Sequence, residues 1–210
     1  MRSDSHGAAG WQTITGALTG TRKVQMLATR SNKRSPHQHS SVNYFAYGSN
    51  LWQPRLERRV GALARPRVAQ LFGHQLCWHK HSSDGSGKCD AFRNDGSVVL
   101  GALYTLETAQ IAQLDEIEGV GKGYRRDESL SVICGGKSVQ IVTYIAELDY
   151  VDSSLQPYAW YHAFVLAGAL ELRFPADHVD RLRRQSTKAD PDLTRSAREA
   201  KILKLRATGG

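Results

Sequence analysis

Val42-Asn43-Tyr44-Phe45-Ala46-Tyr47-Gly48-Ser49-Asn50 is the stretch of sequence that decides the fold. It begins with β-branched and aromatic residues in a short apolar run, which predicts a strand. The strand breaks at Gly48, and a helix is expected over 51–58, with Asn50 as its N-cap and Pro54 in its first turn. Backbone N–H groups at such a helix start lack partners, so the turn is suited to cradle an anion or a developing oxyanion. For Gly-Ser-Asn alone, the simpler interpretation is an ordinary turn that binds nothing.

A second group of residues, Leu114-Asp115-Glu116-Ile117-Glu118-Gly119-Val120, closes a helix predicted over 107–116. Its three carboxylates lie at the negative end of the helix dipole, where each acid costs a few tenths to about 1 kcal/mol at the surface. One interpretation is a solvated acidic turn that water and salt screen. The other is a carboxylate placed to accept and return a proton. The spacing alone does not say which acid that would be.

These two motifs resemble those of the γ-glutamylcyclotransferase family. Tyr-Phe-Ala-Tyr-Gly-Ser-Asn at 44–50 is similar to the family's signature at the end of the first strand. Leu-Asp-Glu-x-Glu-Gly-Val at 114–120 is similar to its second motif, in which the Glu before Gly is the catalytic acid and base. Tyr-x-x-x-Val-x-x-Gly-Ala, leading to Phe174-Pro175, is similar to the family's late helix. The motifs occur in family order, and the resemblance covers about 42–184.

The resemblance implies a reaction and a set of site residues. The α-amine of a γ-glutamyl amide attacks its own γ-carbonyl, which gives 5-oxoproline and a free amine without an enzyme nucleophile, a metal or an organic cofactor. The implied catalytic residue is Glu118. The implied substrate-binding residues are Tyr44, Phe45, Ala46, Tyr47, Gly48, Ser49, Asn50 and Tyr161.

Several substrates and one non-catalytic role stay open. The Tyr-Gly-Ser-Asn form is most similar to the branch that acts on γ-glutamyl amino acids. The alternatives within the superfamily are glutathione, a γ-glutamyl amine or a biosynthetic acyl intermediate. Outside enzyme chemistry, the chain could be a module that binds a glutamyl-like ligand. The sequence does not decide between a monomer and a homodimer.

The positive charge of the chain lies at its ends. The formal net charge is +8, but residues 1–40 hold six Lys/Arg against one Asp/Glu, and residues 173–210 hold ten against five. Residues 41–172 therefore carry 12 basic and 14 acidic side chains. A basic groove on the folded domain is not indicated, so we expect no specific nucleic-acid partner.

Composition predicts the domain organisation. Residues 1–40 are rich in Ser, Gly, Thr, Arg and His and are expected to form a disordered basic tail. The resemblance implies a catalytic domain over 41–186, and 187–210 are expected to form a basic C-terminal tail with at most a weak helix. We expect both tails to be dispensable for folding. The N-terminal segment lacks the apolar core of a secretory signal and only faintly resembles an organelle transit peptide. No run approaches the ~20 apolar residues of a membrane span, so no membrane partner is expected.

Cysteine and histidine usage indicates a cytoplasmic protein without a metal. Cys77, Cys89 and Cys134 are odd in number and lack metal-ligand spacing, which fits a reducing cytoplasm. His79 and His81 could bind a metal as His-x-His, but they precede a turn-rich loop, and a solvated loop shoulder is the simpler interpretation.

The remaining periodicity predicts a mixed α/β domain with a small, strongly bent or barrel-like mixed β-sheet flanked by helices. A bend is expected at Gly73, a close backbone approach at Gly101 and a hairpin turn at Gly135-Gly136. The polar segment 147–157 is long enough to act as a lid. Strands are expected over 67–78, 89–92, 98–106, 124–134 and 138–146, and later helices over 158–172 and 175–184.

Overall fold

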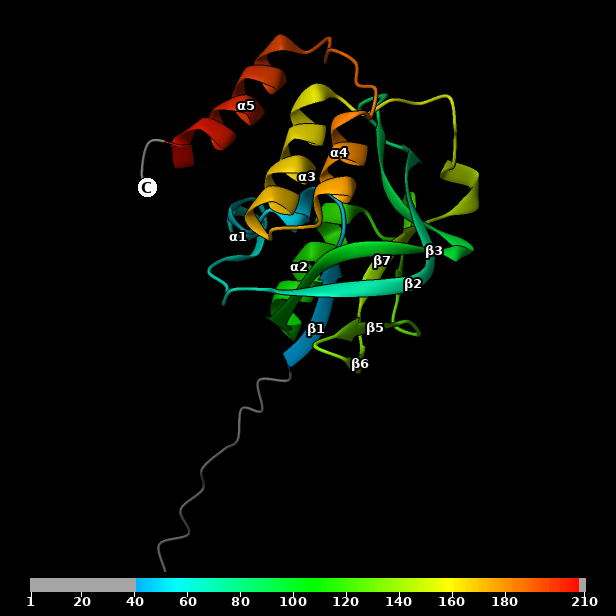
Figure 1. Cartoon of the computed structure of the whole chain (residues 1–210). Coiled ribbons are helices and arrows are strands. Elements are labelled where there is room, and N and C mark those ends of the chain that lie inside the picture. Colours follow the sequence, from blue (N-terminus) through cyan, green and yellow to red (C-terminus); the bar gives the residue numbers. More distant parts are fainter. Residues whose placement is uncertain (1–40, 208–210) are drawn as a thin grey trace, which may run out of the picture. The chain divides into compact units, whose positions relative to one another are not determined.

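The computed structural model describes residues 41–207 and confirms the predicted mixed α/β fold (Figure 1). The predicted disordered tail, 1–40, lies outside the described residues. Within them, one sheet has the order β1-β3-β2-β5-β6, and β4 pairs with β7 in a second ladder. The strands are β1 (Ser41–Ala46), β2 (Arg67–His81), β3 (Gly87–Glu107), β4 (Tyr124–Asp127), β5 (Ser131–Cys134), β6 (Lys137–Gln140) and β7 (Thr143–Ala146).

The sheet is strongly curled, as predicted (Figure 1). Gly73 has a φ of +70°, and the β2–β3 register shifts beside it, which confirms the expected bend. A second register shift separates Cys77 from Lys80. Val142 closes the curl because its N–H donates to Asn43 O at 2.7 Å and its carbonyl accepts from Phe45 N at 2.9 Å. The β4–β7 ladder is thereby joined to the outer edge of β1.

The strands differ from the prediction in their continuity. The segments 89–92 and 98–106 belong to one long strand, β3, because β2 pairs with it along most of its length. Each of the runs 124–134 and 138–146 is divided into two strands, and the Gly135-Gly136 hairpin between them is confirmed. The close backbone approach at Gly101 is also confirmed, since a Cβ there would lie 2.6 Å from Ala46 O of β1, besides 2.4 Å from the Phe45 ring.

Helices and two 3₁₀ turns complete the described fold. The helices are α1 (Gln53–Val60), α2 (Thr108–Glu118), α3 (Ala159–Glu171), α4 (Ala176–Arg183) and α5 (Leu193–Ala207), with 3₁₀ turns η1 (Ser49–Leu51) and η2 (Leu148–Tyr150). Pro54 lies in the first turn of α1, as predicted. Asn50 is not its N-cap: η1 intervenes, and Trp52 occupies the N-cap position without a side-chain hydrogen bond. The Asn50 side chain is therefore available for other contacts.

Helix α3 fixes the turn after β1. A Cβ at Gly168 would lie 2.7 Å from Leu51 C and Trp52 N, so the absence of a side chain allows α3 to contact the η1 backbone directly. Trp52 and Phe164 stack with their ring centroids 5.5 Å apart. The turn that the sequence singles out is thus held by the core of the domain.

The C-terminal segment is more ordered than a basic tail would be. Asp190 is 4% exposed and Glu199 is 9% exposed. Ile202 and Leu203 of α5 pack against the core as partly buried side chains. The predicted boundary at residue 186 therefore omits residues that contact the domain.

The segment 147–157 contains η2 and is tied to the β2–β3 hairpin. Val151 forms an isolated bridge with Lys80, and Gly87 N donates to Gln156 O at 3.0 Å. Its role as a lid stays a prediction. Among residues 41–207, no helix is long and apolar enough to cross a membrane.

Candidate active site

A cavity of about 250 Å³ lies where the β1–η1 turn, α1, the β2–β3 hairpin, the end of α2 and the start of α3 meet. Its lining combines aromatic rings with charged side chains, which is typical of sites for small polar ligands. It is lined by Tyr44, Tyr47, Gly48, Ser49, Asn50, Arg55, Arg59, Lys80, Ser82, Asp84, Lys88, Cys89, Ile117, Glu118, Tyr124, Thr143, Tyr144, Trp160 and Tyr161.

The Asn50 side chain joins the two sequence motifs in this cavity. Its Nδ2 donates to Glu118 Oε1 at 2.9 Å and to Tyr44 OH at 3.0 Å. Its Oδ1 accepts from Arg59 Nη1 at 3.1 Å. The amide thus uses both of its N–H donors and its carbonyl, so Asn50 sets the relative position of Tyr44 and Glu118.

Arg59 explains how carboxylates are tolerated at the end of α2. Its Nη1 also donates to Glu118 Oε1 at 2.7 Å, and both side chains are partly buried. Asp115 accepts from Arg126 at 2.6 Å and from Tyr144 OH at 2.8 Å. Local cations and donors therefore offset the unfavourable end of the helix dipole at two of the three acids.

Gly48 and Tyr161 are in close contact at the cavity wall. A Cβ at Gly48 would lie 3.0 Å from Tyr161 OH and 3.1 Å from Cys89 Cβ. Tyr161 OH accepts a 3.1 Å hydrogen bond from Cys89 N. Burial raises the pKa of Tyr44, Tyr124 and Tyr161, so these phenols stay neutral at physiological pH.

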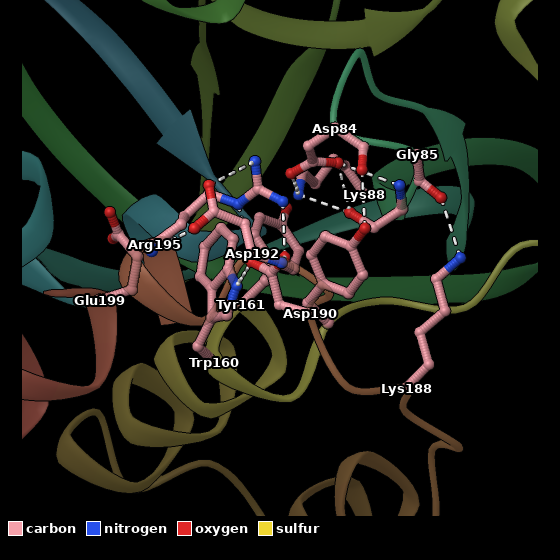
Figure 2. Close-up of polar contacts among 12 residues, drawn as sticks. Asp84, Gly85, Lys88, Trp160, Tyr161, Lys188, Asp190, Asp192, Arg195 and Glu199 are labelled. Carbon is pink, nitrogen blue, oxygen red and sulfur yellow. Dashed lines mark hydrogen bonds and ion pairs between the residues drawn. The ribbon is translucent and has the colours of Figure 1, made fainter. Parts of the chain in front are cut away.

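The β2–β3 hairpin brings two lysines to the cavity. Lys80 and Lys88 are opposite each other in the β2–β3 register. Lys88 Nζ donates to Asp84 Oδ2 and to Ser86 Oγ, each at 2.7 Å, and it lies 4.8 Å from the Trp160 ring centroid (Figure 2). Burial lowers the pKa of both lysines. Like charges on facing residues are unfavourable in a sheet, so this pair is not explained by sheet formation.

The C-terminal segment supports two residues of the wall. Trp160 Nε1 donates to Asp190 Oδ2 at 2.7 Å, and Arg195 binds both oxygens of Asp190 at 2.6 and 2.7 Å (Figure 2). Arg55 Nη1 donates to Glu199 Oε2 at 2.8 Å, and its guanidinium lies 4.2 Å from the Phe164 ring centroid. Lys188 adds a 2.9 Å hydrogen bond to Gly85 O, which ties the segment to the hairpin loop (Figure 2).

The structure brings most of the predicted site residues together. Phe45 and Ala46 are fully buried and do not line the cavity; they belong to the core beneath the turn. The predicted residues that do line it are Tyr44, Tyr47, Gly48, Ser49, Asn50, Glu118 and Tyr161. Their roles in binding and catalysis stay predictions.

Sequence reasoning missed the cationic residues of the wall. Arg55 and Arg59 could have been found, because they are spaced i, i+4 on the helix that directly follows the turn. Lys80 and Lys88 carry no such signal, since only the strand register places them together.

The remaining candidates for reactive groups are a histidine of the hairpin and a thiol of the cavity wall, His79 and Cys89. His79 Nε2 lies 2.9 Å from Asp90 Oδ2, within the hairpin. Residues 41–207 contain no group of three or more His, Cys, Asp or Glu side chains arranged to hold a metal ion. Cys89 lines the cavity, but burial raises the pKa of its thiol, which disfavours the nucleophilic thiolate.

Comparison with known proteins gives one consistent relationship. Residues 98–182 match the model of the AIG2-like family. The chain is 29% identical to a human γ-glutamylcyclotransferase over 149 residues, which cover 68% of this chain and 78% of that protein. It is 28% identical to the mouse γ-glutamylcyclotransferase over 146 residues, which cover 67% and 76%. A solved γ-glutamyl cyclotransferase superposes with a TM-score of 0.67 at 26% identity and covers 79% of this chain and 99% of its own.

Proposed function

We propose that the chain, which is similar in sequence and fold to γ-glutamylcyclotransferases, cyclises the γ-glutamyl group of a γ-glutamyl amino acid to 5-oxoproline and releases the free amino acid. The observation that carries the proposal is the 2.9 Å hydrogen bond from Asn50 to Glu118. It places the turn and the acidic motif at one cavity, within reach of a single glutamyl-sized ligand.

The chemistry requires few protein groups. The substrate's α-nitrogen forms a bond to its own γ-carbonyl carbon, and the amide C–N bond of that carbonyl then breaks. Because the nucleophile is tethered, orientation alone can supply effective molarities on the order of 10⁵ to 10⁸ M. The protein must fold the chain toward ring closure, move protons from the α-nitrogen to the leaving nitrogen and stabilise the oxyanion.

Glu118 is assigned the proton transfer. A free α-amine has a pKa of roughly 8, so it is mostly protonated and unreactive at neutral pH. Glu118 takes one proton from the ammonium and returns it to the leaving nitrogen. The second proton that the α-nitrogen loses on ring closure ends on the released amine, which departs as an ammonium, so protons balance over the cycle. Arg59 and Asn50 both donate to Oε1, whereas no residue of the described chain donates to Oε2. We therefore assign the proton transfer to Oε2.

The other lining residues are assigned to binding. The turn at 47–50 receives the glutamyl α-carboxylate or the oxyanion, and Tyr161 with the neighbouring rings holds the glutamyl chain and excludes water. The cavity volume of about 250 Å³ suits a ligand the size of a dipeptide.

The test is direct detection of both products. Purified protein is incubated with γ-glutamyl-L-alanine, glutathione and a γ-glutamyl alkylamine, and 5-oxoproline and the released amine are quantified by mass spectrometry. We expect equal amounts of the two products, formed fastest from γ-glutamyl-L-alanine. Binding of these compounds without product would contradict the proposal and favour a non-catalytic binding module. A preference for another panel member would retain the cyclisation and correct the substrate.

A further inference from the structure

One cation of the cavity lacks a protein counter-ion. Three of the four cationic side chains in the wall bind a carboxylate at 2.7–2.8 Å, in the pairs Arg55–Glu199, Arg59–Glu118 and Lys88–Asp84. The fourth is Lys80. Within residues 41–207, no carboxylate lies within 4.0 Å of its amine, and none of the hydrogen bonds there involves its Nζ.

Lys80 is nevertheless a buried residue, 7% exposed. Lysines are almost never this buried without a partner, because the ammonium loses its hydration. Its Nζ lies 4.6 Å from the Tyr124 ring centroid and 6.0 Å from that of Tyr150, and these rings offset part of that loss. The charges of Glu118, Asp84 and Glu147 act on it from a greater distance. The free protein thus keeps a partly compensated cation at the cavity wall.

The surrounding backbone holds this amine in place. Gly123 has a φ of +120°, and a Cβ there would lie 2.7 Å from Lys80 Cε and 2.9 Å from Nζ. The Lys80 backbone is held between β3 and Val151. Lys80 differs from a mobile surface lysine in two ways. Gly123 leaves room for its ammonium, and the neighbouring strands fix the position of its backbone.

We propose that Lys80 is a specificity-determining residue that binds the carboxylate of the departing amino acid. This assignment rests on the proposed function. A γ-glutamyl amino acid carries two carboxylates, and of the two roles proposed for the turn at 47–50 this assignment takes binding of the glutamyl carboxylate. Arg59 and Lys88 are paired within the protein, so Lys80 remains as the charge partner for the second carboxylate. A substrate that lacks this carboxylate leaves Lys80 uncompensated.

The test uses two substrates that differ in this carboxylate, γ-glutamyl-L-alanine and γ-glutamylethylamide. Lys80→Met keeps the length of the side chain and removes its charge. We expect it to lower kcat/KM for the alanine compound by roughly 10- to 100-fold, the value of a charge-assisted hydrogen bond. For the ethylamide, kcat/KM should change by less than about 3-fold. Lys80→Arg should restore part of the preference, because it restores the charge.

Matched controls separate this proposal from the proposed function. Lys137→Met removes an exposed lysine on β6 and should leave kcat/KM unchanged for both substrates. If Lys80→Met lowers kcat/KM equally for both substrates, or for neither, the proposed role of Lys80 is wrong while the cyclisation stands. If the wild type converts neither compound, the proposed function fails, and calorimetric binding of the same two compounds decides the role of Lys80. Equal binding of γ-glutamyl-L-alanine by wild type and Lys80→Met would then overturn it, and weakened binding of that compound alone would support it.

Discussion

Arg59 Nη1 lies 2.7 Å from Glu118 Oε1, although the two residues are 59 positions apart in the sequence. The contact joins the first helix after the turn to the last residue of α2. It supplies a cation at a helix end that disfavours an acid, and it holds one carboxylate oxygen in a fixed position. The same nitrogen also donates to Asn50 Oδ1, so the ion pair and the turn form one hydrogen-bonded unit.

Glu118→Gln is the first test of this unit. The Gln carbonyl can still accept from Arg59 and Asn50, so the geometry should persist, but the amide cannot take a proton. We expect binding of a γ-glutamyl compound to survive while turnover falls by at least ~100-fold, the lower end of general-base contributions. Turnover is measured as 5-oxoproline release, and binding by calorimetry. Full activity of Glu118→Gln would refute the assignment of the base.

The matched control is Glu116→Gln, because Glu116 is an exposed acid two positions away on the same helix. It should leave turnover within about 2-fold of the wild type. Asp115 is a poor control, since its carboxylate accepts from Tyr144 OH and Arg126. The sequence shows three similar acids here, and only the packed structure distinguishes them.

Asn50→Ala tests whether the amide positions the carboxylate of Glu118, the proposed general base. Removing it leaves Tyr44 OH and Glu118 Oε1 each without one donor, which should lower the free energy of unfolding by about 1–3 kcal/mol. Because Glu118 then loses orientation, we expect kcat to fall by roughly 10-fold or more, with a smaller change in KM. Asn50→Asp should not restore activity, since a second carboxylate beside Glu118 would be repelled and could not donate. Wild-type kcat in Asn50→Ala would exclude the positioning role.

The sequence predicted the parts of the site that lie within continuous motifs. Local residue types predicted the turn and the acidic helix end. The order of these motifs, which resembles that of a family, added Tyr161. The predicted N-cap role of Asn50 was wrong, because the η1 turn, which packs against Gly168 of α3, includes Asn50 and precedes α1. Lys80 could not be recognised, because its burial depends on Gly123 and on the strand register.

Gly48→Ala tests the contact between the turn and Tyr161. The new Cβ would meet Tyr161 OH at 3.0 Å and Cys89 Cβ at 3.1 Å, so the phenol must shift by a few tenths of an ångström and weaken its bond from Cys89 N. Small displacements at a reacting centre are costly, and we expect kcat/KM to fall by roughly 10-fold. Gly96→Ala, on the exposed part of β3, has no atom within 4 Å of its new Cβ and should be silent. Equal activity of the two variants would contradict this contact's importance.

The ordered C-terminal segment changes the expectation for truncation. A chain ending at residue 186 would lose the Asp190 hydrogen bond to Trp160 and the Glu199 ion pair with Arg55. We therefore expect a lower Tm and reduced turnover, measured by thermal unfolding and 5-oxoproline release. Unchanged values for both would show that 187–210 is a dispensable tail, as its composition alone suggested.

Asp190→Asn isolates the electrostatic part of this effect through its pH dependence. The hydrogen bonds from Arg195 hold the pKa of the Asp190 carboxyl well below its ordinary value. A depressed folded-state pKa contributes stability that is fully present above the unfolded value of about 3.9 and is lost as the pH falls through the folded-state pKa. The Tm deficit of Asp190→Asn should therefore be largest at pH 5 and above and should shrink below about pH 4. Asp177→Asn removes an exposed ion pair with Arg181 on α4 and should change Tm little at any pH. A deficit for Asp190→Asn that does not vary with pH would attribute the contribution of this residue to packing instead of charge.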